Sequence, residues 1–387
     1  MPDAVRLSPN GKETEERILK SAVRLFSANW YGSVSVAEIC RDAGLSNGVF
    51  YRYFRNKAEL CKTILSVTQN RIADALAAVA GETPRERLPQ FVNILMDFSY
   101  VHPDLIAVFR EGQYRFIEYE KSLEELYQRG LSQVLGMEIG APESIFALGG
   151  IRYCAIRRGL HGESLDPASV LAIIEGGLFP GLEARTEKVF ADPLHPPSLD
   201  VEEGAKDSLL RAGKRLFGER DFVDTNIHEI TDAADLAVGT FYTYFPSKEA
   251  FFAELIRRIG HDLRRFIASN LAAEGLNRLE REMRGLWLFM RYLQSDTYFY
   301  NIVRQGEFIL PEEARAYYAA FIAGYAKRPL SKNGLAAGID EGTAVEFLLG
   351  VGHYLGIESI LAAGSGSIRD KIEAIGRYFA RGFSLVL

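Results

Sequence analysis

The chain has 387 residues, of which 48% are hydrophobic and 25% are charged, and this length favours two or more folded domains. It contains no run of roughly 18 apolar residues, and the segment 1–10 has neither an apolar core nor a cleavage pattern, so we expect no membrane helix and no signal peptide. The net charge of −6 argues against general attraction to nucleic acid. The three cysteines have neither disulfide nor metal-site spacing, which is typical of a cytoplasmic protein.

The first predicted elements are two short helices after a longer one. Apolar residues follow a helical spacing from Ile18 to Phe26, and a turn is expected at 30–34. Ser35 and Glu38 form a capping-box pattern, in which each side chain can bond the backbone of the other. A turn at Gly44 and an N-cap at Ser46 then predict a helix over 47–54, so the pattern is that of a helix-turn-helix.

Helical periodicity continues in the rest of the first half and then returns in the second. Apolar-periodic segments are expected at about 60–80, 91–100, 122–135 and 143–159, and again at 251–271, 279–294, 312–325 and 343–362. Alternating strand patterns do not accumulate, so the predicted fold class is all-α. Pro193, Pro196 and Pro197 indicate an extended linker over 190–201.

An internal repeat organises the chain. A shift of 191 residues aligns 17–57 with 208–248 and gives 14 identities in 41 positions, including Phe50 with Phe241 and Lys57 with Lys248. The body segments 109–114 and 146–153 resemble 303–308 and 347–354, with shifts of 194 and 201 residues. The predicted domains are therefore a first head (11–62), a first body (63–189), the linker, a second head (202–253) and a second body (254–387).

The segment from Ala43 to Leu60 resembles the TetR family signature, and the segment from Val238 to Phe251 resembles it as well. The resemblance implies a small DNA-binding head and a helical body for ligand binding and dimerisation in each half. It also implies DNA contacts from the outward residues of each helix-turn-helix. In the first head these are Ser35, Ser46, Asn47, Gly48, Val49, Tyr51, Arg52, Tyr53 and Lys57, and in the second they are Val238, Gly239, Thr240, Tyr242, Tyr244 and Lys248.

Within those sets, different contacts are expected. By the resemblance, Asn47, Val49 and Tyr51 would meet base edges, whereas Ser35, Tyr53 and Lys57 would hold phosphates. Phe50 and Phe54 lie four residues apart and are expected in the core.

The second head departs from the first in ways that weaken its predicted DNA binding. Asp235 replaces Gly44 in the turn, which Asp tolerates better than most residues, and Ala237 replaces the N-cap Ser46. Residues 11–62 carry nine Lys or Arg against six Asp or Glu, whereas residues 202–255 carry six against eleven. Two alternatives remain open: two working heads that read unlike half-sites, or one working head and a degenerate copy.

In the TetR family the last two body helices form the dimer interface. The matching segments here are 146–160 with 169–182, and 347–361 with 367–383, and Gly149, Gly150, Gly350 and Gly352 indicate close backbone approach there. We expect this interface to form within one chain as a pseudo-dimer, with a homodimer of tandem chains as the alternative.

A small, apolar effector is expected among the body helices, although plain core packing explains the same residues. The candidates are Met96, Tyr100, His102, Phe109, Glu111 and Tyr114 in the first body, and Trp287, Met290, Tyr292, Phe299 and Phe308 in the second. No catalytic motif, metal-ligand cluster or cofactor signature is recognised. The predicted function is a DNA-binding regulator that acts as a repressor, and the alternative is a helical scaffold whose heads no longer bind DNA.

Overall fold

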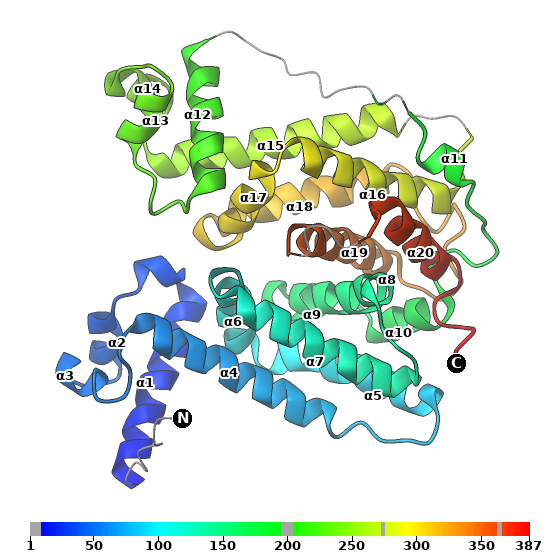
Figure 1. Ribbon diagram of the computed structural model, residues 1–387, viewed down its shortest axis with the longest axis horizontal. Helices are drawn as coiled ribbons and strands as arrows, with labels where there is room; N and C mark the ends of the chain where they lie inside the picture. The colour runs from blue at the N-terminus through cyan, green and yellow to red at the C-terminus, as the bar shows by residue number, and fades with distance from the viewer. Residues whose placement is uncertain (1–8, 193, 195–203, 272–274, 362–365) are drawn as a thin grey trace. The chain divides into compact units, whose positions relative to one another are not determined.

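Figure 1 shows the computed structural model, which describes residues 9–192, 194, 204–271, 275–361 and 366–387. Within these ranges the backbone forms helices and turns and no strand, so the all-α prediction is confirmed. None of the described helices is both long and apolar enough to cross a membrane. The chain divides into two compact units: unit 1 runs to Ile139 and includes Cys154–Leu165, whereas unit 2 comprises Gly140–Tyr153 and Asp166–Leu387.

Unit 1 begins with a head of three helices joined to one end of the long helix α4 (Figure 1). The head consists of α1 (Pro9–Ala28), the 3₁₀ turn η1 (Tyr31–Ser33), α2 (Val36–Asp42) and α3 (Asn47–Phe50). The body consists of α4 (Lys57–Leu76), α5 (Pro84–Val101), α6 (Pro103–Arg115), α7 (Ile117–Leu135) and the part of α9 (Gly150–His161) that starts at Cys154. Helix α6 packs against both α1 and α4, and so joins the head to the body.

Unit 2 repeats this plan. Its head consists of α12 (Ala205–Glu219), α13 (Ile227–Ala233) and α14 (Val238–Tyr244), which lie at one end of α15 (Lys248–Asn270) (Figure 1). The body continues with α16 (Arg278–Ser295), α17 (Tyr298–Ile309), α18 (Pro311–Ala326), α19 (Glu341–Leu361) and α20 (Ile368–Arg381). Helix α17 packs against α12 and α15, as α6 packs against α1 and α4.

Unit 2 also contains a segment of the first half. This segment comprises α8 (Ala141–Glu143), the π-helical turn η2 (Ser144–Gly149), the start of α9, α10 (Pro167–Gly176) and α11 (Thr186–Val189). Its elements α8, η2 and α10 lie beside α19 and α20, and α11 packs against α16. Phe146 contacts the rings of Phe347, Phe379 and Phe383 at centroid distances of 5.5–6.1 Å. The division by packing therefore differs from the division by sequence repeat, because Gly140–Tyr153 and the residues from Asp166 pack with the second half.

The contacts of this segment are reciprocal. A Cβ atom added at Gly149 would lie 3.0 Å from the Cβ of Tyr354, and one added at Gly350 would lie 2.5 Å from the Cβ of Tyr153. The predicted shift of 201 residues relates Gly149 to Gly350 and Tyr153 to Tyr354, so each glycine receives the tyrosine of the other repeat. Such an exchange is the mark of a twofold, isologous contact.

Glycines at the ends of α10 and α20 make a second reciprocal contact. Gly177 lies against the backbone of 379–381, and Gly382 lies against the backbone of Ile174 and Glu175. Backbone hydrogen bonds join the same strip, from the Phe383 N–H to the Ile174 carbonyl at 2.8 Å and from the Leu178 N–H to the Phe379 carbonyl at 2.7 Å. Three of the four predicted interface glycines thus allow close approach, whereas Gly352 has only an ordinary contact, 3.4 Å from Leu286.

Some expectations about the elements need correction. The helix predicted over 47–54 ends at Phe50 in the first head, and residues 51–53 form turns with N–H to carbonyl bonds three residues back. Helices α6 and α17 were absent from the predicted segments. The predicted linker 190–201 lies mostly outside the described residues, which include only 190–192 and 194 of it.

Candidate nucleic-acid interface

Both heads begin their helix-turn-helix with the predicted capping box. The Ser35 hydroxyl accepts from the Glu38 N–H at 3.2 Å, while the Glu38 carboxylate accepts from the Ser35 N–H at 2.7 Å. Asn226 and Glu229 make the same pair of bonds at 3.0 and 2.9 Å. These backbone hydrogen bonds to the carboxylates lower the pKa of both Glu38 and Glu229. The start of α2 and of α13 is therefore fixed by local chemistry in each head.

The turn between the two helices also has one geometry in both heads. Gly44 has φ +66° and Asp235 has φ +56°, and Asp235 is the one described residue other than glycine with a positive φ. The Leu45 N–H bonds the Cys40 carbonyl at 2.8 Å, and the Leu236 N–H bonds the Thr231 carbonyl at 3.0 Å. This six-residue closure is the Schellman motif, which requires a left-handed residue at the position of Gly44 and Asp235. The second turn keeps its shape because aspartate tolerates that conformation.

The segment after the turn buries its phenylalanines and exposes its tyrosines. Phe50 and Phe54 are buried, as are Phe241 and Phe245 in the second head. Tyr51 is 60% exposed and Tyr242 is 54% exposed. The outward residues of the predicted set are exposed at Asn47, Arg52 and Tyr244, and half-buried at Val49, Tyr53, Val238 and Thr240. A Cβ atom added at Gly48 or Gly239 would meet nothing within 4 Å, so this face is open in both heads.

Ser46 is the N-cap residue of α3, as predicted, but its side chain does not form the capping hydrogen bond. Ser46 has extended backbone angles directly before α3, and its hydroxyl makes no capping hydrogen bond. Ala237 occupies the same place before α14. The expected loss of a cap in the second head is therefore wrong, because the first head has no such hydrogen bond to lose.

The two lysines predicted to hold phosphates have partners inside their own heads. The Lys57 Nζ donates to the carbonyls of Tyr31 and Val34 at 2.8 and 2.7 Å, and lies 4.2 Å from the centre of the Tyr31 ring. The Lys248 Nζ donates to the carbonyls of Phe222 and Thr225 at 2.8 and 3.0 Å, and lies 4.1 Å from the Phe222 ring. Burial lowers the pKa of both ammonium groups. Each ammonium is therefore bound to backbone carbonyls of its own head, a role that the predicted phosphate contact did not include.

Charge separates the two interfaces at a few aligned positions. Residues 35–57 contain four cations, and residues 226–248 contain only Lys248, whose ammonium is held inside the head. Asp232, Thr243 and Pro246 stand where the first head has Arg41, Arg52 and Arg55. All six residues are exposed. The second head therefore lacks the three exposed cations of the first head and has one carboxylate, Asp232, in their place. Arg41 and Arg55 are further candidate DNA contacts of the first head that the sequence pattern did not indicate.

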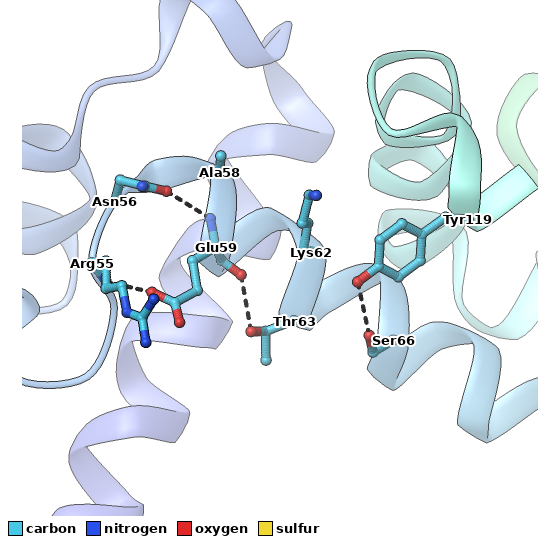
Figure 2. A pocket seen from close by; sticks show the side chains of 8 residues that line it. All are labelled: Arg55, Asn56, Ala58, Glu59, Lys62, Thr63, Ser66 and Tyr119. Carbon is cyan, nitrogen blue, oxygen red and sulfur yellow. Dashed lines mark hydrogen bonds between the residues drawn. The ribbon is translucent and has the colours of Figure 1, made fainter. Parts of the chain in front are cut away.

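A shallow groove of about 400 Å³ lies beside the first head, between the start of α4 and the start of α7. Figure 2 shows Arg55 and Asn56 at one end and Tyr119 at the other. Lys62, between them, pairs with Glu118 at 2.7 Å, and the Ser66 hydroxyl lies 3.2 Å from the Tyr119 hydroxyl. None of the predicted effector residues lines this groove.

The predicted effector residues differ in how far they are exposed to solvent. Met96, Phe109, Trp287, Met290, Tyr292 and Phe299 are buried, His102, Tyr114 and Phe308 are half-buried, and Tyr100 is 62% exposed. The Glu111 carboxylate accepts from the Tyr31 N–H of the head at 2.8 and 2.9 Å. Tyr100 therefore lies on the surface, and Glu111 lies at the junction of head and body, where neither was expected.

Comparison with known proteins gives matches in the same two regions. The family model described as bacterial regulatory proteins, tetR family, matches residues 18–64 and again residues 209–255. The HTH-type transcriptional regulators YerO and YdgC of Bacillus subtilis (strain 168) are 25% and 34% identical over 132 and 107 residues, which are 31% and 27% of this chain. The repressor DhaR of Mycobacterium sp. (strain GP1) is 38% identical over 63 residues, which are 16% of this chain.

The matched stretches span 46% of YerO, 53% of YdgC and 32% of DhaR, so the chain covers about half or less of these relatives. The family match falls on the two heads, where the capping box, the left-handed turn and the exposed tyrosines occur twice. The chain therefore contains two TetR-like halves in tandem, each carrying the segment that the model of tetR-family bacterial regulatory proteins describes.

Proposed function

We propose that this protein is a DNA-binding transcriptional regulator whose two heads contact one operator. The observation that carries the proposal is the repeated open face around Tyr51 and Tyr242, set on a capped helix and a closed turn in each head. Base edges are contacted by Asn47, Val49 and Tyr51 in the first head and by Val238, Thr240 and Tyr242 in the second. Because these side chains differ, the two half-sites have different sequences.

The chain acts as a pseudo-dimer. The reciprocal contacts of Gly149 with Tyr354 and of Gly350 with Tyr153 support this assignment, since they use the segments that form the dimer interface in the family. Burial of this face within one chain leaves it unavailable to a second copy. One molecule therefore supplies both heads to an asymmetric operator, whereas a homodimer of identical heads reads a near-palindrome.

The two heads contribute unequally to affinity. Arg41, Arg52 and Arg55 neutralise phosphates in the first head, and neighbouring hydroxyl groups such as that of Tyr53 fix its position. The second head has no exposed Lys or Arg at the aligned positions. It adds sequence readout with little phosphate neutralisation, so the first head dominates binding at low salt and its advantage shrinks as salt rises.

A small effector in the bodies controls operator binding, and the regulator is a repressor in the cytoplasm. The buried apolar residues Met96, Phe109, Met290 and Phe299 support an apolar ligand. The relative DhaR carries the name of a repressor. Ligand binding in a body changes the spacing of the heads from the ~34 Å that successive major grooves require.

The test is selection of bound sequences from random duplex DNA by the purified chain, with stoichiometry measured by light scattering. We expect two unlike half-sites about one helical turn apart, bound by one chain. Tyr51→Ala should abolish enrichment of one half-site and Tyr242→Ala that of the other, which makes each variant the control for its partner. A palindrome bound by two chains would refute the pseudo-dimer. Absence of any enrichment would favour the scaffold.

A further inference from the structure

The same chain of hydrogen bonds runs from body to head in both halves. In the first, the Glu111 carboxylate on α6 accepts from the Tyr31 N–H, and the Tyr31 carbonyl accepts from the Lys57 Nζ on α4. In the second, the Gln305 Oε1 on α17 accepts from the Phe222 N–H at 2.7 Å, and the Phe222 carbonyl accepts from the Lys248 Nζ on α15. One residue of the head is thus held on both sides of its backbone.

Each lysine also fixes the start of the helix-turn-helix. Its second acceptor is the carbonyl of the residue directly before the N-cap, which is Val34 before Ser35 and Thr225 before Asn226. The lysine itself is the first residue of the long body helix in both halves. The ammonium therefore ties the beginning of α2 or α13 to the beginning of α4 or α15.

The body helix that carries the acceptor is held tightly against the same long helix. Gly112 follows Glu111, and a Cβ atom added there would lie 2.7 Å from the Leu65 Cδ2 of α4. Gly306 follows Gln305, and a Cβ atom added there would lie 2.6 Å from the Ile256 Cδ1 of α15. A movement of α6 against α4 would therefore pull the two bonds on Tyr31 apart.

The side chains differ between the halves while the bonds are the same. Tyr31 is replaced by Phe222, Val34 by Thr225 and Glu111 by Gln305, and the acceptors of each lysine are main-chain carbonyls in both halves. Because the pattern uses the backbone, it survives these replacements. The acceptor from the body is a charged group in the first half and a neutral one in the second.

We propose that Lys57 and Lys248, together with Glu111 and Gln305, are positioning residues that fix the orientation of each head relative to its own body for DNA binding. Their part in DNA binding is indirect, and this assignment rests on the proposed function as a DNA-binding regulator. It differs from a phosphate contact in a measurable way. Affinity for duplex DNA falls as salt rises, and the steepness of this fall is the magnitude of the slope of log affinity against log salt. Each phosphate contact that is lost reduces this magnitude by about 0.9.

The first experiment measures that slope for Lys57→Met and for the matched control Arg52→Met, on the duplex that the full chain enriches from a random pool. We expect Lys57→Met to weaken binding about tenfold, as for loss of a charge-assisted hydrogen bond, with an unchanged slope. Arg52→Met should lower the slope by about 0.9. A matching drop in slope for Lys57→Met would overturn the proposal in favour of a phosphate contact.

The second experiment uses the body residue, which lies on α6 outside the helix-turn-helix. Glu111→Ala should weaken binding to the same duplex and speed amide hydrogen exchange over 31–42, while Glu111→Gln, which supplies the group of Gln305, should restore both. Exchange in α5 and α7 is the control for general unfolding. Unchanged exchange over 31–42 in Glu111→Ala would refute positioning. If no duplex is enriched, the proposed function fails, and the exchange measurement still decides the positioning role.

Discussion

Gly350 lies directly against Tyr153, so that a Cβ atom at Gly350 would come within 2.5 Å of the Tyr153 Cβ and within 2.8 Å of the Gly149 carbonyl oxygen. The Gly149 oxygen belongs to the backbone and the Tyr153 Cβ is bonded directly to it, so neither atom can move away by a side-chain rotation. The contact joins residues almost two hundred positions apart in the sequence. It is one of the two reciprocal contacts in which a glycine of one repeat lies against the tyrosine of the other.

The first prediction is that Gly350→Ala destabilises unit 2. We expect a loss of about 1–3 kcal/mol in the free energy of unfolding, because the added methyl group forces the helices apart. Urea unfolding followed by circular dichroism measures it. Gly285→Ala on α16 is the matched control, since a Cβ atom there meets nothing within 4 Å and alanine favours a helix by about 1 kcal/mol. Equal midpoints for the two variants would contradict the close contact.

The second prediction concerns the turn of the second head. Asp235→Ala should destabilise that head by about 1 kcal/mol, because alanine adopts a left-handed conformation less readily than aspartate. Asp235→Asn should keep the stability, since asparagine tolerates the same conformation. It should also tighten operator binding by roughly twofold to fivefold at low salt, because it removes a negative charge from the outward face. Fluorescence anisotropy on the enriched duplex tests this, and weaker binding by the asparagine variant would contradict it.

The heads were predictable because the interactions that shape them are local. Ser35 and Glu38 lie within one turn of each other, as do Asn226 and Glu229, and the left-handed turn depends on one residue. The four-residue spacing of Phe50 and Phe54 also predicted that both are buried, and both are, although the helix itself ends at Phe50. Such features can be read from neighbouring residues without knowledge of the tertiary fold.

The head-to-body contacts were missed because their partners are distant in sequence and lie on the main chain. The carbonyl groups that accept from Lys57 have no side-chain signature, and Glu111 is 80 residues from Tyr31. Helices α6 and α17 each contain a glycine that weakens a helical pattern, yet Gly112 and Gly306 are the positions of close packing. The recurrence of both lysines at one shift was the available signal, and it was interpreted as DNA contact.

The third prediction is a pH dependence of unit 2. Hydrogen bonds and an ion pair from Arg185, at 2.6 and 2.7 Å, lower the pKa of the buried Glu280 to about 2, with further bonds from the Arg185 and Asn277 N–H groups. A depressed carboxylate pKa contributes stability that is present above the unfolded pKa near 4.5 and is lost as pH falls toward 2. The urea midpoint should therefore fall steeply over this window.

Glu280→Gln supplies the comparison for that titration. It should be less stable than the unaltered chain at neutral pH and should lose less stability on acidification, because the glutamine does not titrate. Glu312→Gln is the matched control, since its carboxylate is exposed and its pair with Arg315 is a surface pair of little expected worth. A parallel pH profile for Glu280→Gln and the unaltered chain would show that another group governs the acid response.

The fourth prediction is that one added cation gives the second head a phosphate contact like that of Arg52 in the first head. Thr243 stands where the first head has Arg52, and it is exposed on the outward side of α14. Thr243→Arg should increase the magnitude of the slope of log affinity against log salt by about 0.9 on the enriched duplex, and it should tighten binding at low salt. Ser269→Arg adds the same charge near the far end of α15, roughly 30 Å along the helix from the head, and should change neither quantity. If both variants raised the slope equally, net charge would explain the effect. If neither did, α14 would lie away from the phosphates, and the first head alone would contact DNA.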